Sequence, residues 1–256
     1  MKVLGVEFLR SAASAADFPR DPVPQLALVG RSNVGKSSLI NALTRARVAR
    51  TSAAPGKTRL LNLYLVRLPG PGLERVYLVD LPGYGYARGG ARAASVFDAL
   101  VGEYFAHAPW EGAARREPPA PSADRAAGRD PQARARPAGP AAAVLLVDAR
   151  HPGLETDRAA LDWLLRHDRP VVVVASKIDK LARAERLRAE REWAAALNVP
   201  ILPVSAVTGE GLNELWKRIS RLLLSAPTER SVPPRAIPAP TTAATSPSST
   251  SRRSRT

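Results

Sequence analysis

Residues 30–38 read GRSNVGKSS and follow directly on the apolar run LALV at 26–29. The spacing Gly-x-x-x-x-Gly-Lys-Ser, from Gly30 to Ser37, is that of a loop that wraps phosphate groups. Its glycines let backbone N–H groups turn toward phosphate oxygens, and a helix that begins near Ser37 adds its positive end. Average residue usage gives a chance match in a chain of this length on the order of 1 in 100. The stretch therefore predicts a phosphate-binding loop between a strand and a helix.

Two side chains of this loop carry chemistry. We expect Lys36 to reach the β- and γ-phosphates of a nucleotide, and the hydroxyl of Ser37 to ligate Mg²⁺. The alternative is a tight glycine turn that holds no ligand.

The rest of the chain alternates between short apolar runs and amphipathic segments. Strands separated by helices indicate a mostly parallel sheet covered on both faces. We therefore predict an α/β fold: a three-layer P-loop NTPase with a six-stranded sheet that is parallel except for one antiparallel strand. The expected strands are 26–29, 60–68, 75–79, 143–147, 171–175 and 201–204, and the expected helices are 37–45, 94–107, 155–167, 181–197 and 211–224.

A carboxylate follows the strand at 75–79, in the sequence Asp80-Leu81-Pro82-Gly83. Asp80 is placed to hold Mg²⁺ through a water, and Gly83 to offer its backbone N–H to a γ-phosphate. An Asp-x-x-Gly sequence alone is a common turn. Its position after a strand and downstream of a phosphate loop makes it a specific signal, because ligands in such sheets lie at the carboxyl ends of the strands.

The identity of the nucleotide base is predicted by the sequence Ser176-Lys177-Ile178-Asp179, which follows the strand at 171–175. A carboxylate here can accept two hydrogen bonds from guanine, from N1–H and the 2-amino group, which adenine does not offer. A site that depends on such a partner rejects its absence by roughly 10⁴–10⁵-fold. The stem of Lys177 can lie over the purine. The alternative for this segment alone is an ordinary polar loop.

Two weaker segments complete the set. Val204-Ser205-Ala206 follows the last strand, where backbone groups can meet the guanine O6. Thr58, within Gly56-Lys57-Thr58-Arg59, can ligate Mg²⁺ when its loop closes on a γ-phosphate, which would make a nucleotide-gated switch.

These segments give the predicted site. Catalysis is assigned to Lys36 and Thr58, and metal binding to Ser37, Thr58 and Asp80. The expected nucleotide contacts are Gly30, Arg31, Ser32, Asn33, Val34, Gly35, Lys36, Ser37, Ser38, Gly56, Lys57, Thr58, Arg59, Leu60, Asp80, Leu81, Pro82, Gly83, Ser176, Lys177, Ile178, Asp179, Val204, Ser205 and Ala206.

Composition limits the binding partners and the cellular compartment that we expect for this chain. The formal net charge of +15 favours polyanions such as nucleic acid, although the excess could equally lie on solvated tails. The chain has no cysteine, which suits a reducing compartment. It has neither a secretory leader nor an apolar run of membrane-spanning length, so we expect a cytoplasmic protein. We also expect a monomer.

Three segments fall outside the predicted core. Residues 1–24 are read as an N-terminal extension to a G domain at 25–224. Residues 111–142 contain no Val, Ile, Leu, Met or aromatic residue, which predicts a flexible insertion. Residues 225–256 end in SRRSRT and predict a disordered basic tail.

The motifs also resemble a known family. GRSNVGKSSLINAL, PGKTRLLNLY, DLPGYGYA and LLVDARH are similar to the EngB family of bacterial GTPases, among the translation-factor-like G proteins. The resemblance covers roughly residues 5–110 and 143–223. It implies a P-loop fold of the Ras-like G-domain type that binds GTP and GDP with Mg²⁺. It also implies a role in assembly of the large ribosomal subunit with its ribosomal RNA, and a requirement for normal cell division and septation. Ser176 departs from the family's usual Thr, and the insertion at 111–142 is extra.

Two residues qualify the expected mechanism. Many GTPases place a Gln directly after Asp-x-x-Gly to orient water, whereas this chain has Tyr84, so we expect slow intrinsic hydrolysis. Asn33 resembles the Asn of potassium-stimulated GTPases, which predicts K⁺ beside the phosphates; a turn-forming Asn is the equal alternative. The competing functions are a phosphate-loop ATPase or kinase, and a scaffold for division proteins in which nucleotide is only structural.

Overall fold

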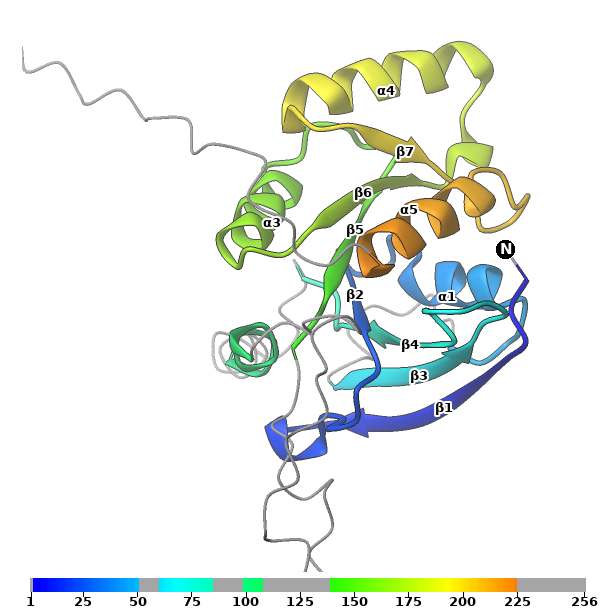
Figure 1. Ribbon diagram of the computed structural model, residues 1–256. Coiled ribbons are helices and arrows are strands. Elements are labelled where there is room, and N and C mark those ends of the chain that lie inside the picture. Colours follow the sequence, from blue (N-terminus) through cyan, green and yellow to red (C-terminus); the bar gives the residue numbers. More distant parts are fainter. Residues whose placement is uncertain (1, 51–59, 85–98, 108–138, 225–256) are drawn as a thin grey trace, which may run out of the picture.

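The computed structural model describes residues 2–50, 60–84, 99–107 and 139–224, and the remaining residues are drawn as a thin grey trace in Figure 1. Thr58 and its neighbours Gly56, Lys57 and Arg59 lie outside the described residues, as do most of the predicted insertion and the whole predicted tail. Among the described helices, no segment combines the length and apolar character that crossing a bilayer requires.

A twisted sheet of seven described strands forms the centre of the molecule (Figure 1). Its strand order is β1-β3-β4-β2-β5-β6-β7. β3 pairs antiparallel with both β1 and β4, and every other described pairing is parallel. The strands are β1 (Gly5–Ala12), β2 (Gln25–Gly30), β3 (Leu61–Arg67), β4 (Arg75–Asp80), β5 (Ala142–Asp148), β6 (Val171–Ser176) and β7 (Ile201–Pro203).

The sheet therefore has one strand more than predicted. Residues 5–12, assigned to an N-terminal extension, form edge strand β1, while β3 alone runs against the others as predicted. The register of β1 shifts between Phe8 and Arg10, which marks a bulge. A bulge breaks the two-residue alternation of side chains, and the apolar pattern by which the sequence would reveal a strand is lost with it.

Helices cover both faces of the sheet, which gives the three predicted layers (Figure 1). α1 (Lys36–Thr44) and α5 (Leu212–Leu224) pack on one face. α3 (Glu155–Arg166), α4 (Arg183–Leu197) and the helical residues 99–106 pack on the other. Along β5 every residue is buried, because alternate side chains enter the two cores. Such a strand reads as a continuous apolar run.

Two stretches of chain meet beside β5. The predicted insertion extended to residue 142, but β5 begins at Ala142, and Ala141 donates its N–H to the carbonyl of Gln25 over 2.8 Å. The residues just before β5 are small, and they pack into the core without large apolar side chains. Gly139 packs so closely on the His107 carbonyl that a side chain would collide with it, and Arg169 donates to that same carbonyl over 2.9 Å.

Candidate functional site

The phosphate loop lies where predicted, between β2 and α1. Gly35 precedes the first residue of α1 with φ 111°, a left-handed conformation that glycine adopts without the steric cost of a side chain. Asn33 is also left-handed, with φ 63°, which Asn tolerates better than most residues. These two turns bend the loop around the N-terminal end of α1, where unpaired backbone N–H groups favour an anion.

Lys36 lies buried beneath this loop. Its ammonium donates to the carbonyl oxygens of Gly30, over 2.8 Å, and Arg31, over 3.2 Å. Burial lowers the pKa of Lys36 to about 8, and the negative charge of Asp80 limits that shift. A nucleotide phosphate would add a second negative charge near this buried ammonium.

Ser37 and Asp80 meet at the predicted metal position. The hydroxyl of Ser37 donates to Oδ2 of Asp80 over 3.0 Å. Burial raises the pKa of Asp80, against the opposing effects of Lys36 and of the Ser37 hydrogen bond. The other oxygen, Oδ1, is buried with no hydrogen-bond partner among the described residues. An orphaned carboxylate oxygen beside a hydroxyl fits the oxygen ligands and bound waters that Mg²⁺ prefers.

The segment of Gly83 lies directly on the phosphate loop. A Cβ at Gly83 would be 2.5 Å from the backbone nitrogen of Ser32, so only glycine fits at this close approach. Leu81 anchors the same segment by burying its side chain.

The two predicted base-recognition segments meet at the ends of β6 and β7. The hydroxyl of Ser205 donates to Oδ1 of Asp179 over 2.7 Å. It also accepts the backbone N–H groups of Val207 and Thr208, over 3.2 and 3.1 Å. Val204 fixes the second segment by donating its N–H to Ala175 over 2.8 Å. The hydrogen bond from Ser205 therefore holds one oxygen of Asp179 in place and orients its carboxylate.

Lys177 connects the base-recognition segment to the phosphate loop. Its ammonium donates to the Asn33 carbonyl over 2.6 Å and to Oδ2 of Asp148 over 2.9 Å. The lysine stem then runs past Gly35, whose Cβ position lies 3.9 Å from Cε of Lys177. Ser176 adds a second connection through its hydroxyl, which donates to the Val34 carbonyl over 2.7 Å.

The structure thus gathers four of the five predicted segments at one edge of the sheet. Leu60, at the boundary of the fifth segment, is 38 % exposed directly before β3. The remainder of that segment, with Thr58, is outside the described residues.

Sequence comparison identifies the family. Residues 25–177 match the protein family described as "50S ribosome-binding GTPase". The chain is 38 % identical to the probable GTP-binding protein EngB of Chlorobium luteolum over 87 % of this chain and 92 % of that protein. It is also 38 % identical to the corresponding protein of Pelotomaculum thermopropionicum, over 86 % of this chain and 96 % of that one. The chain belongs to the EngB family of GTP-binding proteins. It is accordingly a GTPase with the predicted P-loop fold.

Solved structures agree on the fold. Aquifex aeolicus Era bound to GDP and aluminium fluoride superposes with a TM-score of 0.57 at 23 % identity, over 82 % of this chain and 60 % of that one. A probable GTP-binding protein EngB superposes with a TM-score of 0.51 at 21 % identity, over 78 % of this chain and 98 % of that one.

Asp148 lies in the candidate site, and the sequence suggested no role for it. It ends β5, and its carboxylate accepts hydrogen bonds from Lys177 and from the side chain of Arg150, the latter over 2.7 and 2.9 Å. Burial opposes ionisation of Asp148, but the hydrogen bonds from Arg150 and Lys177 outweigh it and keep the pKa below its usual value. Its position at the carboxyl end of a buried strand was the available signal.

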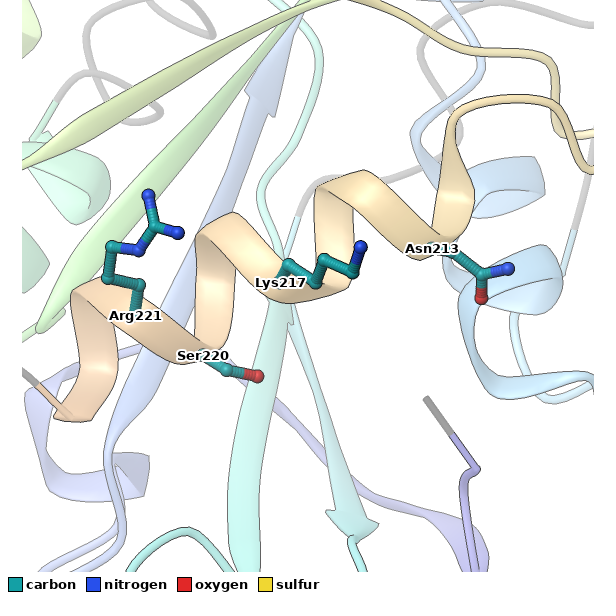
Figure 2. Close-up of a pocket in the computed structure, with 4 residues that line it drawn as sticks. All are labelled: Asn213, Lys217, Ser220 and Arg221. Atoms are coloured by element: carbon teal, nitrogen blue, oxygen red, sulfur yellow. The ribbon is translucent and has the colours of Figure 1, made fainter.

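A hollow on the outer side of α5 is separate from the candidate site. It is lined by Asn213, Lys217, Ser220 and Arg221, all from one helix (Figure 2). None of the predicted nucleotide contacts lines it, so we do not assign it to nucleotide.

Proposed function

We propose that this EngB-family chain is a GTP-gated assembly factor for the large ribosomal subunit. In this proposal it binds GTP with Mg²⁺, hydrolyses it slowly in the bacterial cytoplasm as a monomer, and is required for normal cell division and septation. The observation that carries the nucleotide part is the convergence of Lys36, Ser37, Asp80 and Asp179 at one edge of the sheet.

The Mg²⁺ part depends on three oxygen ligands from different loops. Ser37 and Asp80 are hydrogen-bonded neighbours, and the orphaned Oδ1 of Asp80 supports a metal-bound water there. Thr58 is proposed as the third, gating ligand from the loop before β3. A bound ion would neutralise the charge that develops on the transferred phosphoryl group.

Slow hydrolysis follows from Tyr84. This residue occupies the position after Gly83 where many GTPases carry a water-orienting Gln, and its phenol is instead hydrogen-bonded to Asp157 over 2.7 Å. We expect an isolated turnover below about 1 s⁻¹, since even GTPases with an arginine in cis remain slower than that.

Asn33 is proposed to ligate K⁺ beside the phosphates. Its left-handed backbone supports the turn-forming interpretation equally. Asn33→Gly separates the two, because glycine keeps the backbone conformation and removes the side-chain oxygen. We expect faster GTP turnover in K⁺ than in Na⁺, and loss of that difference in Asn33→Gly. Equal rates of the unaltered protein in the two cations would exclude the ion.

The proposed binding to the large ribosomal subunit is supported by positive charge on α5. Lys217 and Arg221 lie about one turn apart on the outer side of α5 (Figure 2), and Arg218 adds a third cation. Glu214 offsets part of this charge through its ion pairs with Lys217 and Arg218. Basic side chains on one helix face can contact RNA phosphates, with an affinity that falls steeply as salt rises.

One experiment tests the whole proposal. GTP and ATP affinities are measured first, followed by sedimentation with large ribosomal subunits in GDP and in a non-hydrolysable GTP analogue. We expect selective GTP binding and co-sedimentation that depends on the nucleotide. Equal subunit binding in GDP and in the GTP analogue would favour the scaffold hypothesis.

Lys217→Ala with Arg221→Ala tests the proposed RNA surface. The double substitution should lower the salt slope of subunit binding by about 1 for each RNA phosphate that is no longer neutralised. Arg188→Ala on α4, whose side chain is 74 % exposed, is the matched control and should leave the slope unchanged.

A further inference from the structure

Asp157, in the first turn of α3, joins two segments of the site. Its Oδ1 accepts a hydrogen bond from Nε of Arg31 over 3.2 Å and another from the hydroxyl of Tyr84 over 2.7 Å. The Asp157 side chain is 0 % exposed. Arg31 belongs to the phosphate loop, and Tyr84 directly follows Asp80-Leu81-Pro82-Gly83. Neither partner is near Asp157 in sequence, so the fold builds this contact.

A backbone contact reinforces it. Ser32 donates its N–H to the Tyr84 carbonyl over 3.2 Å and its hydroxyl to the Gly83 carbonyl over 3.3 Å. Arg31 and Tyr84 also pair as an isolated parallel bridge. Two carbonyl oxygens of the segment after Asp80 are therefore turned toward Ser32. A carbonyl oxygen facing the phosphate loop repels an approaching phosphate oxygen, whereas an N–H would attract it.

We propose that Asp157 is a positioning residue that latches Tyr84 against the phosphate loop and thereby favours GDP over GTP. The inference rests on the GTP-gated switch proposed above. A γ-phosphate that draws the Gly83 N–H toward itself would shift the Gly83–Tyr84 segment, and the hold of Asp157 on Tyr84 opposes that shift. GDP has no γ-phosphate and leaves the latch intact. The contact thus has different free energies with the two nucleotides, which is the requirement for shifting an equilibrium.

A purely structural role for Asp157 is the competing explanation. An acidic residue in the first turn of a helix stabilises it through the helix dipole. That role would affect thermal stability and both nucleotide affinities together. The latch instead changes the ratio of the two affinities.

Tyr84→Phe is the sharpest probe. It removes one hydroxyl and leaves the Asp157–Arg31 ion pair in place, whereas removing Asp157 leaves the Arg31 guanidinium without its carboxylate. Removing one partner of a buried pair is strongly destabilising, so Asp157→Ala serves as the second variant. Tyr77→Phe is the matched control, because Tyr77 also donates to a carboxylate, that of Asp21 over 3.0 Å, outside the site.

The experiment measures the affinities of the full chain for fluorescent GDP and for a non-hydrolysable GTP analogue. We expect Tyr84→Phe to raise the analogue-to-GDP affinity ratio about tenfold, as loss of one hydrogen bond to a charged group implies. Combined with Asp157→Ala, it should add nothing to the ratio given by Asp157→Ala alone. Tyr77→Phe should lower the melting temperature and leave the ratio unchanged.

Three results would overturn the latch while the unaltered protein binds both nucleotides. They are an unchanged ratio in Tyr84→Phe, a lower ratio in Tyr84→Phe, and additive effects of the two substitutions. If the unaltered protein binds neither nucleotide, the proposed function fails first and the latch fails with it.

Discussion

The hydroxyl of Ser205 donates to the carboxylate of Asp179 over 2.7 Å and so joins the ends of β6 and β7. The contact orients the carboxylate before a base arrives. Pre-oriented polar groups of this kind make a site selective, since a ligand without the matching donors leaves them unpaired.

Asp179→Asn should therefore change which nucleotide is bound. We expect GTP affinity to fall by about 10⁴-fold, while xanthosine triphosphate binds better than GTP, because its 2-oxo group accepts from the new amide. Titration with both nucleotides checks this. Unchanged GTP affinity would show that Asp179 does not read the base.

Ser205→Ala should weaken GTP binding by about tenfold, because Asp179 loses the hydrogen bond that orients it. Ser11→Ala is the control. Ser11 donates to Asn62 over 2.6 Å on the exposed face of the sheet edge, so its removal should leave GTP affinity as it was.

Asp148→Asn should weaken both folding and GTP binding. The substitution removes the charge of a buried carboxylate that Lys177 and Arg150 contact, and we expect this to cost about 1–3 kcal/mol. Lys177 then keeps a neutral acceptor where it had a charged one. Glu214→Gln breaks an exposed pair with Arg218 and should cost less than about 0.5 kcal/mol. Urea unfolding and GTP titration of both variants give the comparison, and equal effects would contradict it.

Nucleotide affinity should fall as pH rises above about 8. The pKa of Lys36 is lowered to about 8 by burial, and a bound phosphate raises it again by opposite charge. The bound form therefore holds the proton more tightly. Nucleotide affinity has its full value below pH 8 and declines above it by up to about tenfold per pH unit. Titration between pH 7 and 9 checks the slope. Lys36→Arg stays protonated throughout this range, and its remaining affinity should be flat.

The same group affects stability with the opposite trend. The folded protein binds this proton less tightly than the unfolded chain, whose lysine has the ordinary value of 10.5. Its unfavourable contribution is present in full below pH 8 and is relieved as pH rises toward 10.5. Because other groups also titrate between pH 7 and pH 9, the contribution of Lys36 is measured as a difference. The free energy of unfolding of the original protein is compared with that of Lys36→Arg at each pH.

Ser37→Ala should reduce the dependence of GTP binding on Mg²⁺. The original protein should lose most of its GTP affinity when EDTA removes Mg²⁺, since Ser37 is proposed to hold the ion that would neutralise the phosphates. Ser37→Ala should start weaker and change little on chelation. Ser220→Ala, on the outer side of α5, should respond to EDTA like the original protein. Full chelation sensitivity in Ser37→Ala would remove Ser37 from the metal site.

Local signals sufficed to predict which of the described segments lie together at one edge of the sheet. The segments with Lys36, Asp80 and Asp179 each follow a buried strand, and parallel strands bring their carboxyl ends to one edge. The structure shows the strands and the proximity, while the binding roles of these residues stay predictions.

The contacts of Asp157 could not be predicted in this way. Its partners Arg31 and Tyr84 are 126 and 73 positions away, and no spacing rule connects them. β1 escaped prediction for a different reason, because its bulge at Phe8–Arg10 breaks the alternation that identifies a strand.

The packing of Gly139 on His107 has a consequence for how this domain tolerates change. These residues flank the stretch 108–138, and their contact means that the two ends of this stretch lie side by side. The entropy of closing a loop grows only with the logarithm of its length, so each doubling costs about 0.6 kcal/mol. A site whose two ends already touch can therefore gain or lose many residues at small thermodynamic cost. Such a position suits the grafting of a foreign peptide or reporter domain onto this scaffold.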